Sequence, residues 1–304
     1  MIGISNWCWE WIYDHCMDHL PDGSNSDDII GSIDGKPVTY KEVKFEKENM
    51  VKQSRSLYTI FGKTDLFIQL PYPTNDLPFN EQTVVKSLGN KWPITETVKK
   101  ARHSREDMKK WVLSKTKLKE TSSPSNYKFM MYSFGGLSFP SSNLIQEKEP
   151  TWNVPDDWVV IVMCSSKVEN SQVPPNVVNL TFLDLGEEID FARDLLLAVD
   201  VLVGKTSYGT VTECLYHKIP TLYMERHGMI EHGFTETALI ENLGRSCCGK
   251  VDGEEVTNAL PSLFEKATNA MANLGKEQVR EDLDFTGGQY AVEIICSFLE
   301  ENTQ

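Results

Sequence analysis

The residues best suited to chemistry lie in one short segment, Val203–Glu213, with the sequence Val-Gly-Lys-Thr-Ser-Tyr-Gly-Thr-Val-Thr-Glu. An apolar run precedes its loop and an amphipathic pattern follows, which predicts a strand, a glycine-flanked loop and a helix. Gly209 lets a ligand approach the backbone closely, and the N–H groups of residues 210–212 at the helix start offer an anion site. Glu213, expected in the first turn of this helix, is placed to accept hydrogen bonds from ribose hydroxyls.

The spacing of Gly204 and Gly209 also matches the first part of a P-loop, G-x-x-x-x-G. A P-loop continues with Lys and then Ser or Thr, whereas Thr-Val follows Gly209 and the lysine stands at position 205. The pattern therefore excludes a P-loop. A plain strand-to-helix turn, in which Thr210 only caps the helix, stays an alternative.

A second turn, Ser133–Ser138, follows another expected strand and contains the adjacent glycines Gly135 and Gly136. Glycines at the carboxyl end of a strand suit a close approach of the backbone to a phosphate. This turn is therefore a second candidate contact for a phosphate.

A third turn, residues 224–233, contains one Arg, two Glu and two His within ten residues. Arg226 is expected to clamp a phosphate, and Glu231 to accept hydrogen bonds from a sugar. His227 and His232 are five positions apart, which is the wrong spacing for two metal ligands on one helix face, so no metal site is predicted. A loop of surface salt bridges is the alternative.

Short apolar runs alternate with amphipathic patterns through the last 180 residues. The expected strands are 127–133, 158–164, 177–182, 200–204, 219–224 and 245–249, and the expected helices are 187–198, 209–217, 234–242, 254–273 and 289–301. This alternation predicts a parallel sheet covered on both faces, which is a doubly wound α/β domain. Ligands of such sheets bind at the carboxyl ends of the strands, where the three turns lie.

Residues 1–120 contain fewer strand patterns. Runs 3–5 and 66–70 predict strands, runs 7–20 and 45–61 predict helices, and the polar stretch 21–37 predicts a loop. A sheet of two strands is marginal on its own. We therefore expect a partial α/β domain over residues 1–120, a hinge at 122–125 and a complete domain over residues 125–304.

Composition narrows the range of partners and compartments. The chain of 304 residues has a net charge of −14, which disfavours nucleic acid or an anionic membrane as a partner. No apolar stretch is long enough to span a membrane. The seven cysteines lack a C-x-x-C motif and fit a reducing cytoplasm. The cysteines at positions 8, 16, 164, 214 and 296 are expected to be buried apolar side chains, and only the adjacent pair at 247–248 is a candidate for redox chemistry.

Several motifs in order resemble a known family. The run Asp200–Glu213, with Ile219–Arg226 and Glu231, resembles the donor half (the family 28 C-terminal domain) of GT-B glycosyltransferases, including the bacterial N-acetylglucosaminyltransferase of peptidoglycan synthesis. It is more similar to the glycosyltransferase-like module that precedes the kinase in plant L-arabinokinase. That module has Leu-Gly-Lys-x-Gly-Tyr-Gly-Thr-Val-Ser-Glu at Val203–Glu213, and Asn-Phe-x-Trp-Asp-Trp-Ile-Tyr where this chain has Asn6–Tyr13.

Further positions keep the order of that module or depart from it. Arg102–Arg105 and Ser133–Gly136 keep the order. Ser207 stands where the module usually has Gly, and His232 where it often has a second acid. The family's chain continues upstream of the motif at Asn6–Tyr13, where this sequence begins. The resemblance therefore implies an N-terminally truncated, GT-B-like fold with an incomplete acceptor-side half over residues 1–120 and a nucleotide-sugar donor-binding domain over residues 125–304.

The resemblance implies a glycosyltransferase that binds a nucleotide sugar, expected to be UDP-linked, and transfers its hexosyl group to an acceptor that the sequence does not identify. The alternative is a non-catalytic module that only binds the nucleotide sugar. No cofactor is implied, because loop amides and a basic side chain stabilise the leaving diphosphate in this family. Glu10 is the one candidate for a catalytic base. The implied donor-binding residues are Gly135, Gly136, Gly204, Lys205, Thr206, Ser207, Tyr208, Gly209, Thr210, Glu213, Arg226, Glu231 and His232.

Overall fold

The computed structural model contains two compact units, which are described separately. The first consists of residues 1–92, 227–230 and 286–304, and the second of residues 93–226 and 231–285. The residues described are 2–5, 29–33, 36–39, 64–71, 82–94, 96–118, 123–134, 152–164, 173–225, 231–274, 276 and 280–302.

The second unit is built on a six-stranded parallel sheet with the strand order β11-β10-β9-β6-β7-β8. Its strands are β6 (Lys128–Ser133), β7 (Trp158–Cys164), β8 (Val177–Thr181), β9 (Val201–Gly204), β10 (Thr221–Met224) and β11 (Cys248–Val251). Its helices are α3 (Glu96–Lys99), α4 (Arg105–Lys115), α6 (Tyr208–His217), α7 (Glu231–Leu243), α8 (Gly253–Thr257) and α9 (Pro261–Leu274). The six strands expected here are all present, and the predicted α/β fold with a parallel sheet is confirmed.

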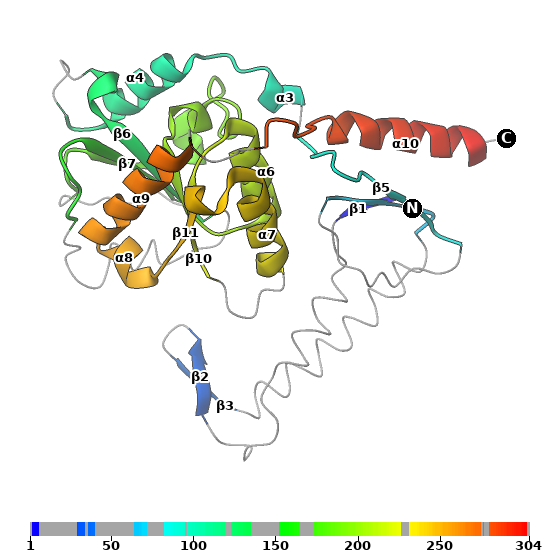
Figure 1. Ribbon diagram of the computed structural model, residues 1–304, viewed down its shortest axis with the longest axis horizontal. Coiled ribbons are helices and arrows are strands. Elements are labelled where there is room, and N and C mark those ends of the chain that lie inside the picture. Colours follow the sequence, from blue (N-terminus) through cyan, green and yellow to red (C-terminus); the bar gives the residue numbers. More distant parts are fainter. Residues whose placement is uncertain are drawn as a thin grey trace. The chain divides into compact units, whose positions relative to one another are not determined.

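Helices flank this sheet (Figure 1). On one face, Met130 and Tyr132 of β6 pack in a core that includes Phe264 of α9. Phe129 of the same strand meets α4, where the ammonium of Lys109 lies 4.7 Å from the centre of its ring. Because neighbouring residues of a strand point to opposite faces, a strand covered on both sides must be apolar throughout. This explains the continuous apolar runs of the sequence.

Asp200, at the amino end of β9, holds α4 in place. Its carboxylate accepts the backbone N–H of Phe129 at 2.7 Å, the Lys109 ammonium at 2.9 and 3.0 Å, and the Arg105 guanidinium at 2.5 Å. Ser104 begins the helix in a capping box with the residue at position 107. The motif at 102–105 therefore serves to start and anchor α4.

The helix expected over residues 187–198 is wrong. The segment forms turns and one short 3-10 helix, Leu195–Ala198. The carboxylate of Asp194 is fully buried and accepts the backbone N–H groups of Asp190 and Arg102. Such bonds between a side chain and the backbone compete with helix formation.

The single helix expected over residues 254–273 is two helices, α8 and α9. Ala259 between them has a positive φ of 45°, and Pro261 is the first residue of α9. Proline suits the first position of a helix but not its interior, so Pro261 marks a start that the apolar periodicity did not reveal.

The first unit contains a three-stranded parallel sheet of order β1-β4-β5 and a two-stranded antiparallel sheet, β2-β3. The strands are β1 (Ile2–Ser5), β2 (Ile29–Ile33), β3 (Lys36–Thr39), β4 (Leu66–Gln69) and β5 (Val84–Ser87). Its helix α10 (Gly287–Asn302) contributes Ala291 to a small core with Leu66, Ile68 and Leu88.

The expectation of two strands before residue 120 is wrong. β5 is exposed along its whole length and has only two apolar residues, Val84 and Val85, so it lacks the longer apolar run by which the buried strands were recognised. β2 and β3 are separated by Asp34-Gly35, a strong signal for a hairpin that the prediction of a loop over residues 21–37 overlooked. The helices expected over residues 7–20 and 45–61 lie outside the described residues.

The cysteines agree only in part with expectation. Cys214 is buried as predicted, whereas Cys296 is exposed, because the side of α10 that packs on the small core carries Ile295 and Phe298 instead. Cys247 is buried and Cys248 half-buried, and neither forms a disulfide bond. The side chains at positions 8, 16 and 164 lie outside the described part of the chain.

The compact units differ in extent from the expected domains, because α4 packs in the second unit and α10 in the first. The division into domains over residues 1–120 and 125–304 stays a prediction. In the described part of the chain, no helix combines the length and apolar character needed to cross a membrane.

Replacing Asp200 with Ala should lower the free energy of unfolding by about 3 kcal/mol. The change leaves the buried N–H of Phe129 and the ammonium of Lys109, whose side chain is 13% exposed, without their acceptor. Asp157→Ala is the matched control, because its ion pair with Lys128 is solvent-exposed and should contribute less than about 1 kcal/mol. Urea unfolding measures both, and equal losses would contradict the anchoring role of Asp200.

Candidate functional site at the carboxyl ends of the strands

The order of the large sheet reverses between β6 and β9. From β6 the chain proceeds outward to β7 and β8, and from β9 it proceeds the other way to β10 and β11. The last residues of these two central strands, Ser133 and Gly204, are register partners. Ligands of open α/β sheets bind at such a switch point. The turns that follow Ser133 and Gly204 therefore start side by side where a ligand is expected.

Gly204 is required by the packing of the sheet. A Cβ atom at this position would overlap the carbonyl oxygen of Ser133, so a larger residue would force β6 and β9 apart. Gly209 differs, because a Cβ atom there would meet nothing within 4 Å. The first glycine therefore holds the strands together, while the second keeps the start of α6 open.

Helix α6 begins after Ser207, whose hydroxyl lies 2.8 Å from that of Thr210. The backbone N–H of Val211 donates to the carbonyl of Ser207 at 2.9 Å. Helical geometry likewise engages the N–H of Thr212 in a hydrogen bond within the helix. The expected anion site at residues 210–212 therefore needs correction. The N–H groups that precede the first intrahelical bond include those of Gly209 and Thr210. Thr210 is the third helical residue and is not the cap.

Glu213 lies in the second turn of α6, one turn later than predicted, since the helix begins at Tyr208. Burial, with a further contribution from the charge of Asp190, raises the pKa of Glu213 to about 7. Near neutral pH its carboxyl group therefore exchanges between donor and acceptor forms. Tyr208 is half-buried, and burial raises the pKa of its hydroxyl above the ordinary value, so it stays protonated.

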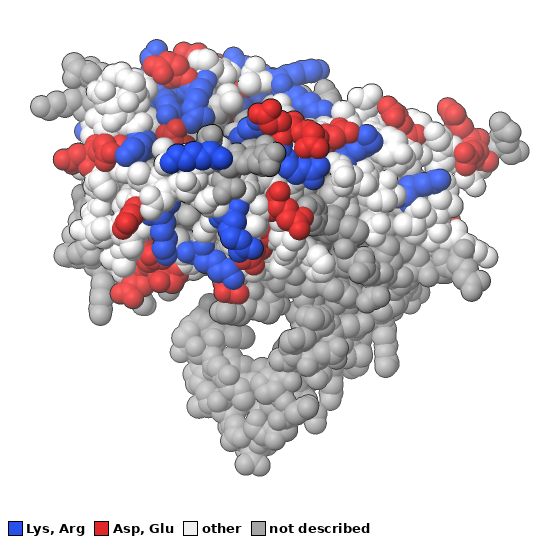
Figure 2. All heavy atoms as spheres, in the orientation of Figure 1, with Lys and Arg blue, Asp and Glu red and all other residues white. Residues whose placement is uncertain are grey.

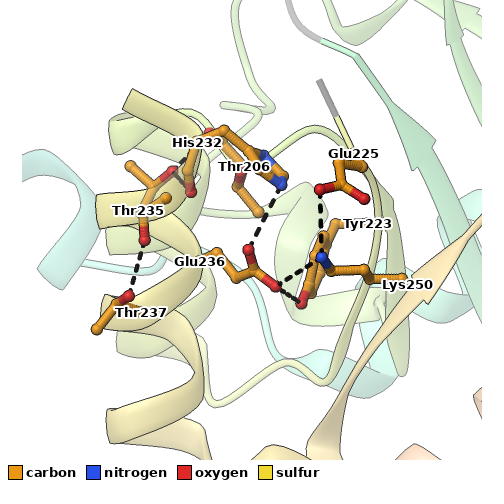
Figure 3. A network of polar contacts seen from close by, with 9 residues as sticks. Thr206, Tyr223, Glu225, His232, Thr235, Glu236, Thr237 and Lys250 are labelled. Carbon is orange, nitrogen blue, oxygen red and sulfur yellow. Dashed lines mark hydrogen bonds and ion pairs between the residues drawn. The ribbon is translucent and has the colours of Figure 1, made fainter. Parts of the chain in front are cut away.

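Thr206 and His232 are in direct contact, although they are 26 positions apart. The hydroxyl of Thr206 lies 2.7 Å from Nδ1 of His232, and both side chains are buried. The hydroxyl of Thr235 donates to the carbonyl of Thr206 at 2.9 Å. Figure 3 shows how the first turns of α7 thus contact the loop after β9 at a side chain and at the backbone.

The other side of the imidazole faces a carboxylate. Nε2 of His232 lies 3.6 Å from Glu236, and Glu236 accepts the hydroxyl of Tyr223 at 2.6 Å. The ammonium of Lys250 lies 3.4 Å from both Glu236 and Glu225. Burial raises the pKa of Glu236, but the hydrogen bond from Tyr223 and the charge of Lys250 outweigh it and hold that pKa below its usual range. These contacts link β10, β11 and α7 (Figure 3).

The structure places some of the predicted donor-binding residues, and others lie outside the described part of the chain. Gly204, Lys205, Thr206, Ser207, Tyr208, Gly209 and Thr210 form a continuous turn and helix start, and Glu213 follows on the same helix. Glu231 is the first residue of α7, although nothing is described of its side chain. Gly135, Gly136 and Arg226, together with Glu10 and His227, lie outside the described residues. We call Gly204, Lys205, residues 207–210 and Glu213 the carboxyl-edge site, because the side chain of Thr206 is buried.

The sequence did not reveal all the residues near this edge. Glu236 follows His232 by four positions, a spacing that places two side chains on one helix face and could have revealed the pair. Phe182 and Leu183, directly after β8, are 58% and 91% exposed. Two large apolar side chains are therefore exposed at the carboxyl edge of the sheet, and the ring of Phe182 also contacts that of Phe191.

Two basic residues of a lysine- and arginine-rich stretch bind at the other edge of the sheet. Residues 99–118 contain eight Lys or Arg and two Asp or Glu, a local balance of +6 in a chain of −14. Figure 2 shows Lys and Arg side chains gathered over the region of α3 and α4, interspersed with acidic ones. Arg105 and Lys109 bind Asp200 at the amino end of β9, which is the opposite edge of the sheet. These two cations are therefore not available to an anion at the carboxyl edge.

Comparison with known proteins gives one curated relative and a set of solved structures. No protein-family model matches the chain. It is 29% identical over 121 residues to L-arabinokinase from Arabidopsis thaliana, an alignment that covers 40% of this chain and 10% of that protein. The chain thus spans a tenth of the length of this relative.

The similar solved structures share 12–14% identity with the chain. They include the wall teichoic acid polymerase TagF (TM-score 0.46, 93% of this chain and 67% of that one), MurG from Acinetobacter baumannii (0.44, 82% and 63%) and the glycosyltransferase SnogD from Streptomyces nogalater (0.41, 82% and 61%).

Glu213→Gln should change how stability depends on pH. The pKa of Glu213 is about 7 in the folded protein, against 4.5 for an unperturbed glutamate, so the folded state binds this proton more tightly than the unfolded state does. The contribution of this proton to the free energy of unfolding is fully present below about pH 4.5 and is lost as pH rises through about 7. Because Gln cannot ionise, the variant does not lose this stabilisation. The difference in free energy of unfolding between the variant and wild type should therefore rise by about 2 kcal/mol from pH 5 to pH 8.

The control for this variant is Glu265→Gln, an exposed carboxylate on α9. Chemical denaturation at several pH values measures the difference between each variant and the wild type. A difference for Glu213→Gln that stays constant with pH would show that this carboxyl group is not desolvated.

Proposed function

We propose that the chain binds a nucleotide sugar, UDP-linked, at the carboxyl-edge site and acts as a glycosyltransferase that moves the hexosyl group to an acceptor. The observation that carries this proposal is the pairing of Ser133 with Gly204 at the switch point of the sheet, directly before the start of α6. The sequence has glycines soon after both of these neighbouring strands, and the chain after Gly204 leads into the N-terminus of α6. This is the arrangement in which α/β proteins bind phosphates.

In this proposal the diphosphate, the ribose and the base of the donor each contact different residues. The N–H groups of Gly209 and Thr210, with the dipole of α6, bind the diphosphate. Glu213, with a pKa of about 7, exchanges hydrogen bonds with ribose hydroxyls. Phe182 and Leu183 at the end of β8 provide an apolar surface for the base, about 10 Å from β6 at the usual strand spacing.

Transfer of the sugar leaves a nucleoside diphosphate with added negative charge. Backbone N–H groups that are already oriented stabilise such charge without rearrangement. The site therefore favours departure of the diphosphate, as expected of a glycosyltransferase. Arg226 is proposed from the sequence as an additional clamp on the phosphates, and the motifs shared with glycosyltransferases support the class of reaction.

UDP should stabilise the full chain against thermal unfolding. At 100 times the dissociation constant the gain is about 2.7 kcal/mol. Gly209→Asp should abolish most of this gain, because its carboxylate faces the phosphate, and should weaken binding at least about tenfold. An acidic residue in the first turn of a helix is itself stabilising by about 0.3–1 kcal/mol, so the ligand-free variant should melt no lower than wild type.

The matched control is Asn126→Asp, which adds the same charge at an exposed position before β6, at the opposite edge of the sheet. Its response to UDP should equal that of wild type. The proposal fails if UDP, UDP-sugars, GDP-sugars and TDP-sugars at millimolar concentration leave the wild-type melting temperature unchanged. Equal UDP responses of Gly209→Asp and wild type would place the nucleotide elsewhere.

A further inference from the structure

Thr206 lies between two fixed points of the backbone. Gly204 before it is held against Ser133 by the packing of β9 on β6, and Ser207 after it begins α6. Thr206 itself is 1% exposed, so its side chain contacts the protein interior and leaves no surface for a ligand. Its conformation nevertheless sets where the first turn of α6 lies.

The contacts of Thr206 come from α7. Its hydroxyl lies 2.7 Å from Nδ1 of His232 and its carbonyl accepts the hydroxyl of Thr235 at 2.9 Å. His232 is 6% exposed and Thr235 2%. Because these groups are buried, each needs its hydrogen-bond partner inside the protein, and the loop after β9 is tied to α7 by complementary donors and acceptors.

The charge of Glu236 favours a proton on Nε2 of His232, although the two groups are too far apart for a hydrogen bond. Its carboxylate lies 3.6 Å from Nε2 and stays ionised because Tyr223 and Lys250 hold its pKa low against the opposing effect of burial. A carboxylate on this side favours a proton on Nε2, which leaves Nδ1 of the neutral ring as an acceptor. The hydroxyl of Thr206 then donates to Nδ1.

We infer that His232 is a positioning residue for the carboxyl-edge site, which binds Thr206 instead of the ligand and so fixes the N–H groups at the start of α6. This inference rests on the proposed nucleotide site and assigns His232 a role behind it. Glu236 supports the same contact by orienting the imidazole. Positioned groups of this kind must be held closely, because small displacements of binding groups lower affinity strongly.

Two substitutions of His232 separate the contact with Thr206 from general packing. Asn places an amide oxygen near the position of Nδ1, whereas Gln places its amide near Nε2 and leaves Thr206 without an acceptor. Isothermal titration with UDP on the full chain should show affinity within about threefold of wild type for His232→Asn, and a loss of roughly tenfold for His232→Gln, the effect of one buried hydrogen bond.

The same contact is tested from the side of Thr206. Thr206→Ser keeps the hydroxyl and should bind UDP like wild type, whereas Thr206→Val keeps the shape and should lose about as much affinity as His232→Gln. The double variant Thr206→Val/His232→Gln should lose no more than either single one, because both remove the same bond. Additive losses, or equal affinities of the Asn and Gln variants, would overturn the inference.

A measurement without ligand distinguishes this inference from the proposed function. Amide hydrogen exchange at Val211 and Thr212 should be roughly tenfold faster in His232→Gln and Thr206→Val than in His232→Asn, with β6 and β9 unchanged. If wild type binds no nucleotide but this pattern is found, the proposed function fails and the positioning of α6 by His232 stands. If His232→Gln does not fold, Thr206→Val gives the same reading, and unchanged exchange there overturns the inference.

Discussion

The close approach of β6 and β9 is the constraint on which the rest of the second unit depends. Ser133 and Gly204 pair in register, and only a residue without a side chain fits at position 204. This contact joins the two halves of the sheet, since the strand order proceeds in opposite directions from it. The chain after Gly204 starts from this point, and α6 begins four residues later at Tyr208.

Carboxylates with little exposure hold the surrounding helices. Their environments distinguish those with a structural role from the one in the carboxyl-edge site. Asp200 and Glu236 each face an ammonium group and a hydrogen-bond donor, Phe129 N–H or Tyr223 O–H. Such pairing compensates for the loss of water. Glu213 instead has burial and the like charge of Asp190 acting together, so its pKa rises to about 7. Near neutral pH this carboxyl group can therefore either donate or accept a hydrogen bond near the start of α6.

The sequence predicted the large sheet well for a physical reason. Strands buried on both faces must be apolar throughout, so runs such as Trp158–Cys164 are visible without any structure. The exposed strand Val84–Ser87 has no such signal, and its pairing with β4 depends on tertiary contacts. The helix expected over residues 187–198 failed because Asp194 binds backbone groups of its own segment and of Arg102, a long-range contact that local patterns cannot contain.

The site was predictable to a similar degree. Glycine spacing and the apolar run before it located the turn at residues 204–210, because these requirements are local. The first-turn N–H groups were misplaced by one or two residues, since the helix begins at Tyr208 and the sequence defines helix ends poorly. The contact of Thr206 with His232 joins positions 26 residues apart and could be seen only once α6 and α7 were packed. The predicted roles of Gly135, Gly136 and Arg226 stay predictions.

The central claim is that a nucleoside diphosphate binds at the carboxyl ends of β6 and β9. Titration of the ¹⁵N-labelled full chain with UDP, followed by the backbone amide resonances, tests it most directly. The account predicts that the largest shift changes fall on Gly209 and Thr210 and on their neighbours in residues 204–213, while Asn126 and Asp157 at the amino ends of the strands do not move. Shift changes confined to the amino ends, or none at saturating UDP, would contradict it.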